Sequence, residues 1–317
     1  MKRNFVIGTR GSDLALWQTD FIKTELENHF PETVFETKII HTKGDAILDT
    51  ALSKIGDKGL FTSQIESALI NREIDLAIHS LKDLPTVQPA GLRIGAVSHR
   101  EMPNDVFISK TVVSLAELPP QSKIATGSLR RRSQLLKFRP DLEIVEIRGN
   151  VPTRIKKFLA SDLDGMILAY AGVHRLKLDS HIKQIVPTEV LLPAVGQGVM
   201  AVEIREDDRE IAGMLRQIND SAVEACITAE RAFLRNLEGG CQVPIGGFAV
   251  LENNEIYLQG FVGDLQGAVF IRDSIRGRID EAEDLGKSLA ERCLMNGAEN
   301  ILREARQAAS LSAGEVV

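Results

Sequence analysis

The sequence predicts an α/β protein in which two units with mostly parallel sheets precede a smaller C-terminal α+β domain. In the first two-thirds of the chain, short apolar runs alternate with amphipathic segments, as in parallel strands that helices connect. From about Ser221, one long helical run precedes consecutive strand-like runs, which is typical of an antiparallel α+β domain. The 317 residues suffice for two or three domains of about 100–200 residues each.

The first unit alternates strand-like and helical runs. Its helix at 12–26 has Ser12 as the expected N-cap and places Trp17 and Phe21 on one apolar face. Strands are predicted at 4–10, 34–42, 75–81 and 91–97, and a second helix at 63–71. The segment 42–61 fits no element, and it is either a lid over a ligand site or a plain surface loop.

The second unit repeats this alternation. Strands are predicted at 105–109, 123–127, 142–149 and 165–172, and helices at 128–138 and 150–161, the latter with Pro152 in its first turn. The run 191–205 ends in a strand that could complete either sheet, and we expect it to return to the first one through a hinge. The predicted α/β lobes are therefore 1–98 with 199–218, and 99–198.

The C-terminal domain is predicted to span 219–317. Its first helix, at 222–237, ends before the glycine pair Gly239 and Gly240. Strands at 247–252, 255–263 and 268–277 follow, and two helical runs come after them. The last residues, 307–317, are small and polar, so we expect them to be disordered.

Composition narrows the classes of partner. The net charge of −6 argues against a general nucleic-acid binder, but residues 123–157 hold ten Lys/Arg and three Asp/Glu, which favours a local anion site. No apolar run approaches the ~18 residues that a membrane span needs, and the N-terminus turns polar too soon for a secretory signal. The three cysteines form neither a disulfide framework nor a metal motif, so we expect a cytoplasmic protein without a metal.

Arginines recur at three strand-to-helix turns. Ser128, Arg130 and Arg131 open one helix, Arg148 and Arg154 flank the next turn, and Arg10 and Ser12 stand at the first. Helix N-termini attract anions, and arginine binds carboxylates or phosphates with its forked donors. Each arginine alone could be a solvated surface charge. Three such turns at the carboxyl ends of parallel strands favour an anion site, because open α/β folds bind ligands there.

Two further residues are candidates for chemistry. Asp83 follows the apolar strand that ends near Ile78, where a carboxylate can stabilise a cation or carry a proton. Its spacing alone favours the simpler role of a turn residue held by Lys82. Cys241 lies in the glycine-rich run NLEGGCQVPIGG, so it is either a harmless exposed thiol or a nucleophile that a ligand must reach.

The chain resembles the porphobilinogen deaminase (hydroxymethylbilane synthase) family over nearly its whole length. The resemblance rests on the ordered motifs GTRGSDLAL, DLAIHSLKDLPT, IATGSLRRRSQL, EIRGNVPTR, LPAVGQG and AERAFLRNLEGGCQVPIGG. It implies two lobes like those of periplasmic binding proteins, plus a third domain. It also implies a transferase of haem-type tetrapyrrole biosynthesis that joins four porphobilinogen molecules head to tail, with loss of ammonia, into hydroxymethylbilane.

The resemblance also assigns roles to residues. It implies a dipyrromethane cofactor joined to Cys241 through a thioether, with Asp83 as the catalytic carboxylate. The residues implied to contact the cofactor are Lys82, Thr126, Ser128, Arg130, Arg131 and Arg148, and those implied to bind substrate are Arg10, Ser12, Arg148, Arg154 and Arg175. Asp13 stands where the family commonly has proline, and the segment after GQG also departs from the family's usual pattern. The first departure lies at the start of the first predicted helix, and the second lies at the expected hinge.

Two other classes remain as alternatives. A two-lobed binding module would share the anion cleft, but it needs neither the third domain nor the Cys241 loop. A cysteine hydrolase needs a partner imidazole, and none of the six histidines has a diagnostic context. We expect a monomer that acts on porphobilinogen and binds neither nucleic acid nor membrane.

Overall fold

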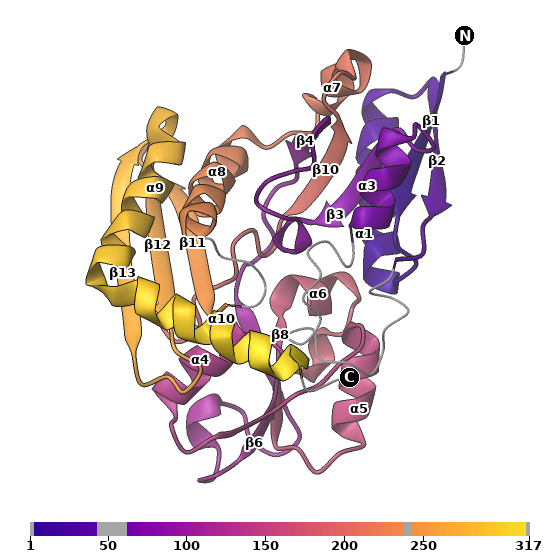
Figure 1. Cartoon of the computed structure of the whole chain (residues 1–317). Helices are drawn as coiled ribbons and strands as arrows, with labels where there is room; N and C mark the ends of the chain where they lie inside the picture. The colour runs from indigo at the N-terminus through magenta and orange to yellow at the C-terminus, as the bar shows by residue number, and fades with distance from the viewer. Residues whose placement is uncertain (1–2, 43–61, 238–242, 315–317) are drawn as a thin grey trace. The chain divides into compact units, whose positions relative to one another are not determined.

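The computed structural model describes residues 3–42, 62–237 and 243–314, and it divides into two compact units (Figure 1). Among these residues, the first unit runs to Glu101 and resumes from Gly198 to Glu224, while the second comprises Met102–Gln197 and everything from Ala225 on. The segment predicted to be either a lid or a loop lies, from residue 43 on, outside the described residues.

The first unit contains a five-stranded sheet in the order β2-β1-β3-β10-β4. Its strands are β1 (Arg3–Thr9), β2 (Thr33–Ile39), β3 (Leu76–Ser80), β4 (Leu92–Val97) and β10 (Met200–Arg205). β1 pairs in parallel with β2 and β3, whereas β10 pairs antiparallel with both β3 and β4. Four strands therefore run in one direction, and only β10 is reversed.

Helices cover both faces of this sheet. They are α1 (Asp13–His29), α3 (Ser63–Ile70) and α7 (Arg209–Leu215), of which α7 was not predicted. Successive residues of a strand point to opposite faces. Ile78 of β3 accordingly belongs to the same core cluster as Leu26 of α1, whereas Ala77 belongs to the cluster that contains Leu69 of α3.

The second unit has a sheet of the same design, in the order β7-β6-β8-β5-β9. Its strands are β5 (Asp105–Ser109), β6 (Lys123–Ala125), β7 (Glu143–Val145), β8 (Gly165–Ala169) and β9 (Ile182–Ile185), and its helices are α4 (Leu129–Phe138), α5 (Val151–Leu159) and α6 (Tyr170–Arg175). β6 is parallel to β7 and β8, whereas β5 is antiparallel to β8 and β9. Here β5 is the one reversed strand.

The strand predicted at 165–172 is too long. β8 ends at Ala169, which pairs with Asp105, the first residue of β5. The N–H of Tyr170 still donates to the carbonyl of Asn104 at 3.0 Å, but at this residue the chain turns into α6. The short strand β9 was not predicted, because its sequence IKQI mixes polar and apolar residues without a strong pattern.

The C-terminal part forms an antiparallel sheet covered by helices. Its elements are α8 (Ser221–Asn236), β11 (Ile245–Glu252), β12 (Glu255–Gly263), β13 (Phe270–Arg278), α9 (Ala282–Cys293) and α10 (Glu299–Gly314). The strands pair in sequence order, and α9 packs on β12 and β13 (Figure 1). Phe233 of α8 and Leu289 of α9 are fully buried in the core between helices and sheet.

The expectation of a disordered C-terminus is wrong as far as Gly314. α10 continues through this segment, and a break at Gly297, with φ of 100°, separates it from α9. Ile301, Leu302 and Ala305 bury one face of α10, and the alanines that follow favour a helix. The predicted fold class, α/β with mostly parallel sheets and a smaller α+β part, is confirmed. No helix in the described part of the chain is long and apolar enough to cross a membrane.

Candidate active site

Four of the predicted site residues gather at one edge of the first sheet. Arg10 and Ser12 follow the end of β1, while Lys82 and Asp83 follow the end of β3. Because β1 and β3 are parallel neighbours, their carboxyl ends meet at the same edge. The hydroxyl of Ser12 accepts a hydrogen bond from the backbone N–H of Ala15 at 3.4 Å, so Ser12 is the N-cap of α1, as predicted.

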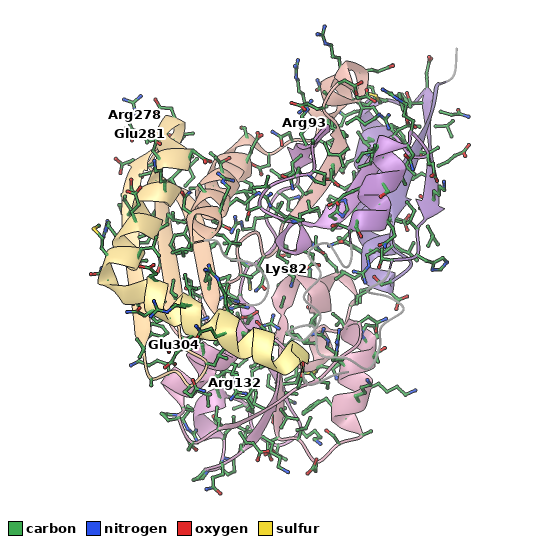
Figure 2. The ribbon with its side chains drawn as sticks, viewed as in Figure 1. Lys82, Arg93, Arg132, Arg278, Glu281 and Glu304 are labelled. Carbon is green, nitrogen blue, oxygen red and sulfur yellow. The ribbon has the colours of Figure 1, made fainter. Side chains whose placement is uncertain are left out.

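Lys82, labelled in Figure 2, and Asp83 belong to a single 3₁₀ turn, Leu81–Asp83. Its first residue, Leu81, is 1% exposed and donates its N–H to the carbonyl of Val199 at 3.0 Å. Leu84, 6% exposed, closes the turn by donating its N–H to the carbonyl of Leu81. The Asp83 side chain between these buried anchors is exposed. The turn therefore presents a carboxylate on a backbone that is fixed at both ends.

Seven further predicted residues gather at the equivalent edge of the second sheet. β7, β6 and β8 are neighbours in the sheet and run parallel, so their carboxyl ends lie side by side. Each end carries part of the set, and in chain order the residues are Thr126, Ser128, Arg130 and Arg131 after β6, Arg148 and Arg154 after β7, and Arg175 after β8. Five arginines thus come to one edge from three separate turns.

Two hydroxyls organise the turn after β6. Ser128 is the N-cap of α4, since its side chain accepts a hydrogen bond from the N–H of Arg131 at 3.4 Å. The Thr126 hydroxyl accepts a bond from the N–H of Ser128 at 3.2 Å. These bonds fix the start of α4 and hence the position of the two arginines in its first turn.

Arg130 and Arg131 are both buried, at 5% and 6% exposure. Arg130 donates from Nη1 to the carbonyl of Leu192 at 2.6 Å and from Nη2 to Asp105 at 2.8 Å. Arg131 donates from Nη2 to the other oxygen of Asp105 at 2.8 Å and from Nη1 to the carbonyl of Ile167 at 3.3 Å. The Nε–H of Arg131 is buried and has no hydrogen-bond partner among the described residues.

The turn after β7 is built around Gly149, whose φ of +120° few other residues tolerate. Its carbonyl accepts a hydrogen bond from Arg154 Nε at 2.6 Å, and the carbonyl of Arg148 accepts one from Lys157 Nζ at 3.2 Å. The Nη1 group of Arg148 is buried without a partner in the described part of the chain. Arg175, the last residue of α6, is 6% exposed. This edge therefore combines several cations with unfilled donors, which suits a ligand with more than one carboxylate.

Sequence reasoning missed Asp105 and Gln197. Asp105 is fully buried between the two guanidinium groups, and Gln197 Nε2 donates to it at 2.9 Å. An aspartate at the head of the apolar strand DVFIS is the available signal, because a buried carboxylate needs a partner. The identity of its partners depends on the sheet order, which the sequence does not contain.

The cysteines separate into two kinds. Cys226 and Cys293 are buried, at 5% and 0% exposure, in the C-terminal core, as their apolar patterns predict. Burial raises the pKa of Cys293 to about 11, so this thiol is a poor nucleophile at neutral pH. Cys241, the predicted point of cofactor attachment, lies outside the described residues.

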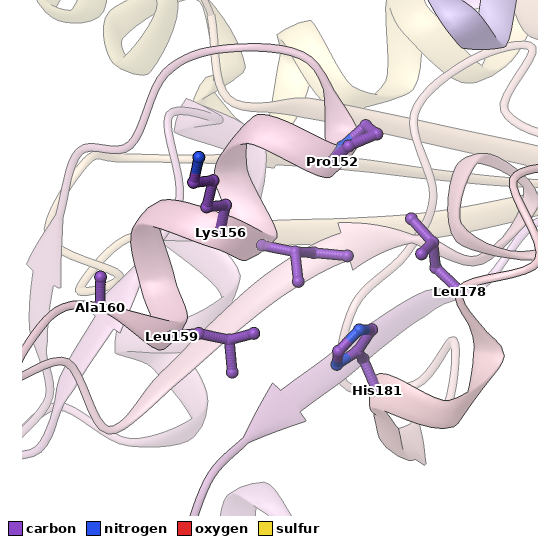
Figure 3. A pocket seen from close by; sticks show the side chains of 7 residues that line it. Pro152, Lys156, Leu159, Ala160, Leu178 and His181 are labelled. Atoms are coloured by element: carbon purple, nitrogen blue, oxygen red, sulfur yellow. The ribbon is translucent and has the colours of Figure 1, made fainter.

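A surface pocket in the second unit contains none of the predicted residues (Figure 3). It lies along α5, and its walls are formed by Pro152, Ile155, Lys156, Leu159, Ala160, Leu178 and His181. These side chains are mostly apolar and offer no carboxylate or thiol. The pocket is therefore not a candidate for the chemistry that the arginine-rich edge suggests.

The chain is similar to known proteins along nearly its full length. Residues 5–213 match the family model "Porphobilinogen deaminase, dipyromethane cofactor binding domain", and residues 224–295 match "Porphobilinogen deaminase, C-terminal domain". Porphobilinogen deaminase of Chlorobium luteolum is 51% identical over 97% of this chain and 99% of its own, and that of Carboxydothermus hydrogenoformans is 50% identical over 98% and 100%.

Among solved structures, a periplasmic substrate-binding protein of an ABC transporter from Coxiella burnetii is similar, with 14% identity and a TM-score of 0.44. That similarity covers 68% of this chain and 91% of the other. The family models and the relatives at about half identity cover both units described above. The chain therefore belongs to the porphobilinogen deaminase family.

Proposed function

We propose that this protein is a hydroxymethylbilane synthase: a transferase that condenses four porphobilinogen molecules head to tail, with loss of ammonia, in tetrapyrrole biosynthesis. The observation that carries the proposal is the 51% identity to a porphobilinogen deaminase over 97% of the chain. The arginine-rich edge of the second sheet supports it independently. Porphobilinogen bears an acetate and a propionate, so a growing product is a polyanion that needs several cations.

The cofactor of this family is dipyrromethane, and the residues present fit its acidic side chains. Arg131 Nε and Arg148 Nη1 are buried N–H groups without a partner among the described residues, and charged donors of this kind bind carboxylates strongly. We propose that Arg130, Arg131, Arg148 and Lys82 hold the cofactor, with the hydroxyls of Thr126 and Ser128 at the same turn. The cofactor supplies the primer to which porphobilinogen units are added.

Cys241 is the proposed point of attachment. A thioether requires a thiol that a ligand can reach, and Cys226 and Cys293 are both buried in the C-terminal core. The pKa of Cys293, raised by burial to about 11, further reduces its reactivity. In the sequence, two glycines at 239 and 240 directly precede Cys241, and glycine has no side chain.

Asp83 is the proposed catalytic carboxylate. In each condensation the amino group of porphobilinogen leaves as ammonia after gaining a proton, and the pyrrole carbon that forms the new bond gives up a proton. The departure leaves a positive charge on the substrate. A carboxylate exposed on a fixed turn can stabilise that charge and carry the protons, which is why Asp83 fits this role.

The other cations serve substrate binding in this proposal. Arg148, Arg154 and Arg175 follow two parallel strands of the second sheet, while Arg10 and Ser12 stand at the edge of the first. Each arginine can bind one carboxylate through a forked pair of hydrogen bonds. Cations distributed over several turns can hold successive acetate and propionate groups as the chain grows.

We further propose three domains: 1–98 with 199–218, 99–198, and 219–317. β10 completes the first sheet, and each proposed domain has its own sheet and its own core. The last two fall into one compact unit because bonds join them, such as Arg132 Nε to the carbonyl of Leu265 at 3.0 Å (Arg132 is labelled in Figure 2). We propose a cytoplasmic monomer that binds neither nucleic acid nor membrane, in keeping with the net charge of −6.

Turnover by the purified protein tests the function and separates it from its rivals. Incubation with porphobilinogen should release four molecules of ammonia for each linear tetrapyrrole formed. A binding module would bind porphobilinogen without releasing ammonia. A cysteine hydrolase would release ammonia, if at all, without joining the rings, and either result would refute the proposal.

A further inference from the structure

A buried cluster of four side chains lies at the start of β5, and the proposed reaction assigns no role to two of them, Asp105 and Gln197. Asp105 has no exposed surface. Its Oδ2 accepts a hydrogen bond from Arg130 Nη2 at 2.8 Å, and its Oδ1 accepts bonds from Arg131 Nη2 at 2.8 Å and from Gln197 Nε2 at 2.9 Å. One carboxylate therefore holds two guanidinium groups and one carboxamide in place.

The charges of this cluster do not cancel. Burial alone would raise the pKa of Asp105, but the guanidinium groups of Arg130 and Arg131 outweigh burial and hold that pKa well below its ordinary value. Asp105 is therefore ionised at neutral pH, and the three groups carry 2 − 1 = +1 in the protein interior. An unbalanced buried charge is costly, so the cluster favours the arrival of one external anion.

The two arginines differ in the N–H donors that remain after they bond to Asp105. Besides its bond to Asp105, Arg130 donates to the carbonyl of Leu192, which also accepts a bond from Gln134 Nε2 at 3.1 Å. Arg131 retains a buried Nε–H with no partner among the described residues. Asp105 thus fixes the plane of the Arg131 guanidinium and leaves one of its donors for a ligand.

Gln197 extends the cluster to two of the places where the chain passes from one unit to the other, at 101–102 and at 197–198. Within the second unit, Gln197 Nε2 donates to the carbonyl of Pro103 at 2.6 Å as well as to Asp105. Within the first unit, Glu101 donates its N–H to the carbonyl of Gly198 at 3.1 Å. Gly198 has φ of +89°, and a Cβ there would lie 2.3 Å from the carbonyl oxygen of Glu101, so only glycine fits this approach.

We infer that Asp105 is a positioning residue for the condensation. It fixes Arg131 with the Nε–H available for a ligand carboxylate, and through Gln197 it ties that geometry to the connections at 101–102 and 197–198. The inference rests on the proposed function, in which Arg131 binds the cofactor. Asp105 acts through Arg131, since its own carboxylate oxygens are already bonded to protein groups.

Three variants test this role, with two readouts. Asp105→Asn keeps the size of the side chain but removes its charge and one acceptor. Gln197→Leu removes the tie to the connections and leaves both arginine–Asp105 bonds intact. The control is Asp75→Asn, which removes the charge from an arginine–aspartate pair in the first unit, where Asp75, with a side chain that is 28% exposed, accepts from Arg205 Nη2 at 3.1 Å. The readouts are the fraction of purified protein that carries the adduct, by intact mass, and kcat/KM for porphobilinogen per folded, adduct-bearing molecule.

We expect Asp105→Asn to lower the adduct fraction and to reduce kcat/KM by about 10–100-fold, as for a misplaced charged hydrogen bond. Gln197→Leu should reduce kcat/KM by about 2–10-fold. Asp75→Asn should lower Tm but leave both readouts unchanged.

Wild-type values of both readouts in Asp105→Asn and Gln197→Leu would overturn the inference, as would an equal loss in Asp75→Asn. If Asp105→Asn fails to fold, the result for Gln197→Leu alone decides, because the ion pairs of Asp105 with Arg130 and Arg131 remain in that variant. A wild-type protein without adduct or turnover would instead refute the proposed function, and the inference with it.

Discussion

Replacing Asp83 with asparagine should separate catalysis from folding. The substitution keeps the shape of the side chain and removes its charge. Asp83 is exposed, and the turn that carries it is held by buried Leu81 and Leu84 and by backbone bonds that the change leaves intact. The free energy of unfolding should therefore change by less than about 0.5 kcal/mol, a shift in Tm below about 2 °C.

The rate should respond very differently. Removing one charged group that stabilises a transition state typically costs about 2.7–4 kcal/mol, or about 10²–10³ in kcat. Steady-state consumption of porphobilinogen and a thermal melt on the same preparation give both quantities. Asp20→Asn, at an exposed position of α1, is the matched control and should alter neither. A rate for Asp83→Asn within about threefold of wild type, or a loss that a lower Tm explains, would refute the catalytic role.

Three further predictions concern the described residues. Iodoacetamide at pH 8 should leave Cys226 and Cys293 of the native protein unmodified, because both are buried. With a pKa of about 11, only about one Cys293 thiol in a thousand is ionised at this pH. Mapping of alkylated peptides with and without urea checks this. Burial raises the pKa of Glu66 above its ordinary 4.5, so this group stabilises the fold below pH 4.5 and loses that contribution as the pH rises through its folded pKa. The Tm of wild type relative to that of Glu66→Gln should therefore be higher at pH 4 than at pH 8, and an equal or opposite difference would contradict the assignment. Phe233→Ala should cost about 3–5 kcal/mol in urea unfolding, because Phe233 is fully buried against Gly247 and Gly260; a loss below about 1 kcal/mol would show that the core closes around the gap.

Local signals in the sequence predicted most of the elements. Alternating apolar runs gave the strands, and Ser12 marked the start of α1 because a side-chain oxygen at that position satisfies a free N–H. Where the pattern was weak, the prediction failed, as for the four-residue β9 and the helix α6. The small, polar residues at 307–317 predict disorder, whereas the burial of Ile301 and Leu302 in the C-terminal core stabilises α10 as a helix.

The sequence predicts which candidate residues stand at the ends of the strands, but not the contacts that these residues make. The sequence shows that each arginine lies in a strand-to-helix turn, because the turn follows an apolar run and a helical run begins after it. Arg130 and Arg131 follow β6, and Asp105 begins β5, which lies one strand away beyond β8 and runs in the opposite direction. The two arginines share Asp105 because of this sheet order, which is a property of the whole fold. The same reason explains why Gln197, distant in sequence from Pro103, was overlooked.

The mass of the purified protein tests the central claim most directly. The account predicts that intact protein exceeds its sequence mass by one two-pyrrole group, that the extra mass maps to the peptide containing Cys241, and that Cys241→Ser lacks it. Cys226→Ser should retain it, because Cys226 is buried in the C-terminal core. An unmodified protein that still converts porphobilinogen to hydroxymethylbilane, or an adduct on a different residue, would contradict the account.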